Sequence, residues 1–249
     1  MHFPTVAGAV VVTYNLPGVT NPLKLDGRTI ADVFLGRIRR WNAPAIAALN
    51  PGVTLPASDM IVVHRSDGSG TTYVFTDYLT AVSPAWAAGP GRGKEVAWPT
   101  GLGGKGNEGV AGQVKQTPGS IGYVELAYAN QNRLAVAEVR NRTGNFIPPT
   151  VESIHAALAG VAGTLPPDTD YRLSIVDAPG AEAYPISSLT WLLVYQQQPN
   201  TRKGQQLADF LRWALTEGER QAAALDYAPL PEAMAQRLIQ RLDSLQLGP

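Results

Sequence analysis

A short stretch of the chain brings together an arginine, two glycines and several hydroxyl residues. It reads RSDGSGTT, covers residues 65–72, and stands between an apolar run and a helical pattern. If it joins a strand to the first turn of a helix, that turn offers unpaired N–H groups and the positive end of the helix dipole. The guanidinium adds a planar pair of donors. The pattern predicts a pocket for a tetrahedral oxyanion, built from Arg65, Gly68, Ser69, Gly70, Thr71 and Thr72.

The same stretch can also form an ordinary structural turn. In that alternative Ser69 or Thr71 only caps the helix, and Arg65 pairs with Asp67. A nucleotide-binding P-loop is not favoured, because no lysine follows the glycine as GxxxxGK[ST] requires. The residue pattern alone leaves the anion pocket and the structural turn open.

A second glycine-rich run, GLGGKG, matches GxGxxG through Gly101, Gly103 and Gly106. It follows AWPT rather than a long strand, and no βαβ unit of suitable size surrounds it, so a dinucleotide site is not favoured. We expect residues 89–109 to form a glycine loop near a cleft, with one short strand at 96–98.

Residues for catalysis or metal binding are sparse. The chain has no cysteine, and its three histidines, His2, His64 and His155, are scattered. An enzyme acting on phosphate esters, which is the alternative function, would need a nucleophile or metal beside Arg65, and the sequence offers no convincing one. We predict a protein that is not an enzyme and uses no metal or cofactor.

The composition indicates a packed globular protein without a strong overall charge. Hydrophobic residues make up 45% of the chain, and 20 basic residues balance 20 acidic ones. A formal net charge of zero argues against nucleic acid as a partner, so an anion site must work through local geometry.

Alternating strand and helix patterns predict an α/β protein. Strands are expected at 6–14, at 60–64, after Gly119, in RLAVAEVR and at 189–195; helices are expected near Thr29 as N-cap, at Pro44, from Thr71, from Asn107 or Glu108, and after Thr150 as N-cap. Two amphipathic helices end the chain. Their apolar faces are expected to hold Leu207, Phe210, Leu211, Ala214 and Leu215 in the first, and Met234, Leu238, Leu242 and Leu245 in the second.

Several long motifs, in this order, resemble the PstS family, the phosphate-binding proteins of the ABC phosphate-uptake system. They are FPTVAGAVVVTYNLPG, LDGRTIADVFLGRIRRWN, RSDGSGTTYVFTDYL, WPTGLGGKGNEGVAGQV, PGSIGYVELAYA and LDYAPLP. The resemblance implies a two-lobed periplasmic binding protein of type II that holds dehydrated phosphate by hydrogen bonds. It implies phosphate contacts from Arg65, Ser69, Gly70 and Thr71, with Asp67 orienting Arg65. It also implies delivery to an ABC permease, a periplasmic or cell-surface location, and a monomer when full-length.

The resemblance also implies a division of the chain. Residues 11–181 are expected to form the second lobe, and residues 1–10 and 182–249 the hinge strands and the C-terminal part of the first lobe. The family carries, ahead of the FPTV strand, a Gly-Ala-Thr-Phe-Pro turn, a serine-glycine helix start and a proton-accepting aspartate, and these do not precede His2. We therefore expect the second lobe to be complete, the first to be partial, and phosphate binding to be impaired. A remnant that acts through protein interaction is a further alternative.

Overall fold

The computed structural model describes residues 1–166 and 168–248. The strands are β1 (His2–Asn15), β2 (Lys24–Leu25), β3 (Ile61–Arg65), β4 (Leu102–Gly104), β5 (Ser120–Glu125), β6 (Ala135–Val136), β7 (Glu138–Arg140), β8 (Phe146–Ile147), β9 (Ser187–Leu193), β10 (Gln197–Gln198) and β11 (Gln246–Leu247). The helices are α1 (Gly27–Phe34), α2 (Pro44–Leu49), α3 (Gly70–Val82), α4 (Pro84–Ala87), α5 (Gly106–Gln116), α6 (Leu126–Asn132), α7 (Val151–Ala162), α8 (Thr201–Ala214), η1 (Gly218–Gln221), η2 (Ala223–Leu225) and α9 (Glu232–Leu242).

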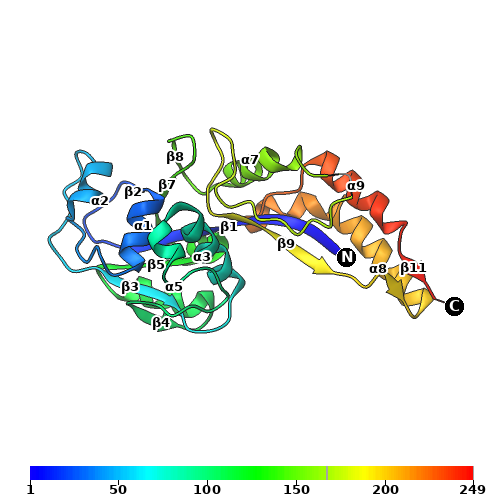
Figure 1. The fold of residues 1–249 in the computed structure, drawn as a ribbon, viewed down its shortest axis with the longest axis horizontal. Helices are drawn as coiled ribbons and strands as arrows, with labels where there is room; N and C mark the ends of the chain where they lie inside the picture. The colour runs from blue at the N-terminus through cyan, green and yellow to red at the C-terminus, as the bar shows by residue number, and fades with distance from the viewer. Residues whose placement is uncertain (167, 249) are drawn as a thin grey trace.

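The molecule is elongated and has two bodies, which one strand connects (Figure 1). The α3 body carries helices α1 to α6, and the α8 body carries α7, α8 and α9. Strand β1 runs through both. Its first half, His2 to Ala9, pairs antiparallel with β9, whereas Val10 to Asn15 pair antiparallel with β5. The two bodies therefore share a continuous backbone ladder.

Strand order in the main sheet is β4-β3-β5-β1-β6, with β9 paired to the other half of β1. Strand β3 runs parallel to β4 and to β5. Strand β5 pairs with Ile61 to Val63, and β4 pairs with Val63 to Arg65. The carboxyl end of β3, which delivers Arg65 to the start of α3, is therefore paired with β4. The sheet thus fixes the position of the strand-to-helix turn.

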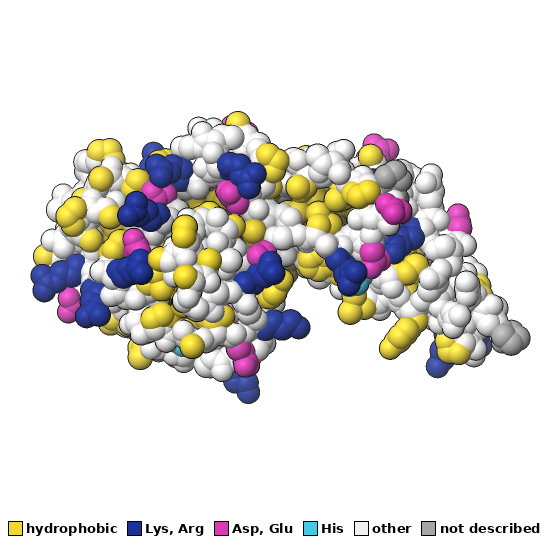
Figure 2. Space-filling view, in the orientation of Figure 1, with side chains coloured by type: hydrophobic (Ala, Val, Ile, Leu, Met, Phe, Trp, Pro, Cys, Tyr) yellow, Lys and Arg dark blue, Asp and Glu magenta, His cyan; other side chains and the backbone are white. Residues whose placement is uncertain are grey.

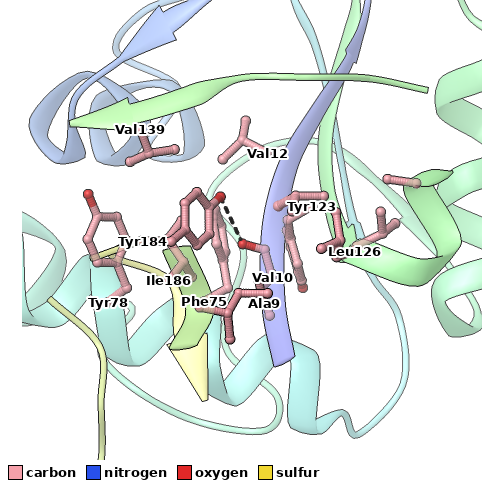
Figure 3. Close-up of a cluster of buried hydrophobic side chains, with 14 of the residues drawn as sticks. Ala9, Val10, Val12, Phe75, Tyr78, Tyr123, Leu126, Val139, Tyr184 and Ile186 are labelled. Carbon is pink, nitrogen blue, oxygen red and sulfur yellow. Dashed lines mark hydrogen bonds between the residues drawn. The ribbon is translucent and has the colours of Figure 1, made fainter. Parts of the chain in front are cut away.

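Aromatic side chains fill the core of the α3 body and hold the shared strand in place. Figure 3 shows Phe75, Tyr123 and Tyr184 around β1, and the hydroxyl of Tyr184 donates to the backbone oxygen of Val10 at 3.2 Å. Phe75 and Tyr123 stack with ring centroids 4.3 Å apart. Tyr184 comes from the chain just before β9, so it ties that segment to the core of the α3 body.

Most expected elements are present, and a few differ. The expected strand at 96–98 is wrong: the strand of this region is β4, because Leu102 to Gly104 find a partner in the edge of β3. The N-cap of α1 is Asp26 rather than Thr29, since the Asp26 carboxylate accepts the Thr29 N–H at 2.8 Å. The stretch RLAVAEVR divides into β6 and β7, which belong to different sheets.

The C-terminal helices form as predicted, but the apolar face of α8 is narrower. Leu211 and Leu215 are buried, whereas Phe210 is 52% exposed. The α8 surface that packs inward instead includes Gly204 and Ala208. In α9 the predicted residues Met234, Leu238 and Leu242 are buried, whereas Leu245 lies beyond the end of the helix and is half-buried.

Gly160 on α7 allows a close backbone approach and gives a first testable prediction. A Cβ built there would lie 2.2 Å from the backbone oxygen of Pro179. We expect Gly160→Ala to lower the free energy of unfolding by about 1–3 kcal/mol, because α7 or the Pro179 segment must shift. Urea denaturation followed by circular dichroism measures this. The matched control is Gly112→Ala on α5, where no atom lies within 4 Å of the added Cβ; it should stabilise by up to about 1 kcal/mol. Equal effects of the two changes would contradict the prediction.

Candidate anion site

Ser69 sets up the first turn of α3. Its side-chain oxygen accepts the N–H of Thr72 at 3.1 Å, and its backbone N–H donates to the Lys94 oxygen at 3.0 Å. The N–H groups of Gly70 and Thr71 come next in the chain, and within residues 1–166 and 168–248 neither has an acceptor. Two backbone donors therefore remain available at the positive end of a helix dipole.

Arg65 and Asp67 form a two-point ion pair. The distances are 2.8 Å from Nε to Oδ1 and 2.7 Å from Nη2 to Oδ2, and the Arg65 side chain is only 9% exposed. The hydrogen bond from Arg65, followed by one from the Gly106 N–H at 3.1 Å, holds the pKa of Asp67 well below its usual range. The hydrogen bond to Asp67 in turn raises the pKa of Arg65. Both shifts favour the charged forms of the pair, and Arg65 keeps Nη1 free of bonds to the described residues.

Tyr123 lies beneath this turn. Its hydroxyl accepts the Arg65 backbone N–H at 3.2 Å and lies 2.7 Å from the Thr72 hydroxyl. Burial raises the pKa of Tyr123 to about 12, so the phenol stays neutral. A buried phenol that touches both the end of β3 and the first turn of α3 fixes their separation.

The turn borders a groove of about 730 Å³ between the two bodies. Figure 2 shows a hollow between them, with Lys and Arg side chains on both sides. Gly70 and Thr71 line the groove, whereas Arg65 and Ser69 are not among its lining residues. The charged or titratable side chains that line it are His2, Tyr73, Asp77, Arg92, Lys94, Glu125, Arg172 and Tyr227.

Glu125 is the acidic lining residue whose carboxyl group is most affected by burial. Its Oε1 atom is buried and has no hydrogen-bond partner within the described ranges. Burial raises the pKa of this carboxyl group above its ordinary value. A carboxyl group that resists ionisation opposes anions in the groove less than a carboxylate would.

Both contacts of the structural-turn alternative are present, since Ser69 caps α3 and Arg65 pairs with Asp67. These contacts do not use the N–H groups of Gly70 and Thr71, so they are compatible with an anion site. Gly106 and Tyr123 were not predicted as parts of the site, although both lie in the sequence motifs named above. Their contacts to Asp67 and Arg65 cross 39 and 58 residues of chain, and no local pattern encodes such partners.

The histidine next to the site has a structural environment. His64 stacks on Trp98 with ring centroids 4.8 Å apart, and its Nδ1 lies 2.9 Å from the Arg65 backbone oxygen. Burial lowers the pKa of His64. Among the described residues there is no group of three or more His, Cys, Asp or Glu side chains that could hold a metal ion. The described helices also include none with the length and apolar character needed to cross a membrane.

The chain has the fold of the PBP superfamily, and residues 1–217 match the PBP superfamily domain. The phosphate-binding protein PstS of Pasteurella multocida is 44% identical over 239 residues, covering 96% of this chain and 69% of its own length. The PstS protein of Methanocaldococcus jannaschii is also 44% identical, over 94% of this chain and 65% of its own length. The chain belongs to the PstS family of phosphate-binding proteins, a family of binding proteins rather than enzymes.

Solved structures show the same fold at low sequence identity. The periplasmic phosphate-binding protein PfluDING, bound with phosphate, gives a TM-score of 0.71 at 21% identity over 95% of this chain and 69% of that one. A phosphate-binding protein from Stenotrophomonas maltophilia gives 0.69 at 21% identity over 96% and 70%. The predicted α/β periplasmic binding protein fold is confirmed. The chain spans about two thirds of the length of its curated PstS relatives, between 65% and 69% for those compared.

Proposed function

We propose that this chain binds inorganic phosphate as part of a solute-binding protein that supplies an ABC-transporter permease. The observation that carries the proposal is the start of α3, where Gly70 and Thr71 line a groove and their backbone N–H groups have no acceptor among the described residues. The proposed contacts are Arg65, Ser69, Gly70 and Thr71, with Asp67 orienting the guanidinium. The names of the PstS relatives support phosphate as the anion.

The remaining features of the proposal follow the family. We place the protein in the periplasm or at the cell surface, as a monomer when full-length, with no nucleic-acid partner. Residues 11–181 are proposed as the second lobe, and residues 1–10 and 182–249 as the hinge strands and part of the first. Within the first of these ranges, α7 lies with α8 and α9 in the α8 body (Figure 1). The change of partner along β1 between Ala9 and Val10 supports a boundary there. Pro167 and Pro249 fall in these ranges but outside the described residues.

Binding by residues 1–249 alone is expected to be impaired. Gly70 is exposed and Thr71 half-buried, so an anion at these donors keeps part of its hydration shell. Hydrogen bonds that compete with water contribute little net free energy. We expect a roughly millimolar dissociation constant, which corresponds to about −4 kcal/mol.

The test is a titration of the ¹⁵N-labelled chain with inorganic phosphate, at ionic strength matched with chloride. We expect saturable shifts of the Gly70 and Thr71 amide resonances. Arg65→Ala should weaken the response by at least about tenfold, because it removes charged hydrogen bonds. Arg140→Ala is the matched control: it removes another Arg–Asp pair, with Asp26, and Arg140 does not line the groove. No saturable shift at these amides, or equal losses in both variants, would refute the proposal.

A second candidate function rests on exposed apolar side chains of the α8 body. Leu193, Tyr195, Phe210 and Trp213 are 74%, 86%, 52% and 50% exposed. A contiguous exposed apolar patch is typical of contact with another polypeptide, and Phe210 and Trp213 are neighbours, with ring centroids 6.0 Å apart. A protein that acts only through this surface would give no amide shift with phosphate in the titration above.

A further inference from the structure

Asn107 connects the start of α3 to the end of β5. It lies near the beginning of α5, where its Oδ1 accepts the Glu125 backbone N–H at 3.1 Å and its Nδ2 lies 3.4 Å from the Thr71 hydroxyl oxygen. An N–H group can only donate, so the contact with Glu125 identifies the amide atom on that side as oxygen. The amide nitrogen must therefore face Thr71.

This contact sets the role of the Thr71 hydroxyl. A hydroxyl has one proton to donate and lone pairs that accept. The bond from Asn107 uses the oxygen of Thr71 as acceptor, and the Thr71 proton has no acceptor among the residues that the structure describes. Two other threonines of α3 behave differently: Thr76 and Thr80 donate to the backbone oxygens four residues earlier, at 2.8 Å and 2.7 Å.

We infer that Asn107 is a positioning residue of the anion pocket, which holds the Thr71 hydroxyl oxygen so that its proton faces the groove. Thr71 lines the groove. Ser69 is arranged alike, since its oxygen accepts the Thr72 N–H. The start of α3 then offers the groove only donors, from two backbone N–H groups and the Thr71 hydroxyl, whereas Ser69 does not line the groove. Such a set suits the ionised oxygens of a tetrahedral oxyanion. The identity of the anion rests on the proposed function, whereas the hydrogen bond between Asn107 and Thr71 does not depend on it.

The hydrogen bond can be tested on the ligand-free chain. Thr71→Val keeps the side-chain shape and removes the hydroxyl, whereas Thr71→Ser keeps the hydroxyl. We expect the side-chain amide resonances of Asn107 to move in Thr71→Val and to stay near their original position in Thr71→Ser. The side-chain amide of Gln113, which donates to the Gly103 oxygen, is the internal reference and should not move. An Asn107 amide that is unchanged in Thr71→Val would overturn the inference.

The direction of the hydrogen bond between Asn107 and the Thr71 hydroxyl is tested with Asn107→Asp and inorganic phosphate. The introduced carboxylate can accept both the Glu125 N–H and the Thr71 O–H, so the Thr71 proton turns away from the groove. We expect the apparent phosphate affinity to fall at least about tenfold. The added negative charge lowers it too, so the Asn107→Asp and Thr71→Val changes are combined in a double-mutant cycle. The double variant should be no weaker than Asn107→Asp alone, because the hydroxyl is already turned away.

Additive losses in this cycle would overturn the inference, since they would mean that the charge acts without Thr71. Asn132→Asp on α6 is the control for adding a carboxylate; Asn132 does not line the groove, and its amide donates to the Tyr128 oxygen. It should change the affinity less than about threefold. If the unsubstituted chain gives no phosphate shift, the proposed function fails, while the ligand-free amide measurement still decides the role of Asn107.

Discussion

Replacing Tyr184 by alanine is expected to lower the free energy of unfolding by about 3–5 kcal/mol. The side chain is fully buried, and it packs beside β1 among core residues that include Phe75, Val12 and Ile186 (Figure 3). Its removal leaves a cavity beside the strand that both bodies share. Urea denaturation followed by tryptophan fluorescence and by far-ultraviolet circular dichroism measures the loss.

Tyr184→Phe separates packing from hydrogen bonding. It removes only the bond to the Val10 oxygen, and we expect a loss of about 1 kcal/mol. Burial raises the pKa of Tyr184 far above its ordinary value, so neither change alters a titration near neutral pH. A loss below about 1 kcal/mol for Tyr184→Ala would contradict the packing argument. Two separate unfolding transitions in Tyr184→Ala would indicate that Tyr184 couples the bodies, which the packing argument alone does not require.

Elements with strong local signals were predictable from the sequence. The apolar run at 6–14 became β1, and Thr150 caps α7 in a reciprocal arrangement with Ser153. The turn from β3 to α3 was predictable for the same reason, because glycines and hydroxyl residues at a strand end encode a helix start locally. The candidate site was found through that turn.

Features that depend on distant partners were not predictable. Strand β4 contains two glycines, which disfavour strands, and it exists because the edge of β3 supplies a hydrogen-bonding partner. Asn107 was expected only as a possible helix start, since its contact with Thr71 crosses 36 residues. Phe210 is exposed because another side of α8 packs against the rest of the α8 body. Helical spacing alone does not show which side of the helix packs inward.

The other large expected effect concerns Glu219 and the pH dependence of the free energy of unfolding. This carboxyl group is half-buried in η1 and accepts the Leu230 N–H at 3.2 Å. Burial raises its pKa from 4.5 to about 7. Between these values the native state keeps a proton that the unfolded state has lost, so stability must fall as the pH rises through this window. Above pH 7 the folded protein carries the cost of a poorly hydrated carboxylate.

Glu219→Gln should remove this cost. The amide keeps an oxygen that can accept the Leu230 N–H, and it cannot ionise. At pH 8 we expect the variant to be more stable than the unsubstituted chain by up to about 3 kcal/mol, the free-energy equivalent of the pKa difference. At pH 4.5 the native carboxyl group is protonated in the unsubstituted chain, so the two proteins should differ by less than about 1 kcal/mol. Urea denaturation at both pH values gives the two differences.

Glu217→Gln, two residues earlier, is the control for the loss of a negative charge. Glu217 is exposed, so its carboxylate is hydrated in the folded and in the unfolded state. That variant should not gain stability between pH 4.5 and pH 8. An equal gain for Glu219→Gln at both pH values would mean that repacking, not ionisation, is responsible. If burial is the cause, the gain must appear only where the carboxyl group of Glu219 would be ionised.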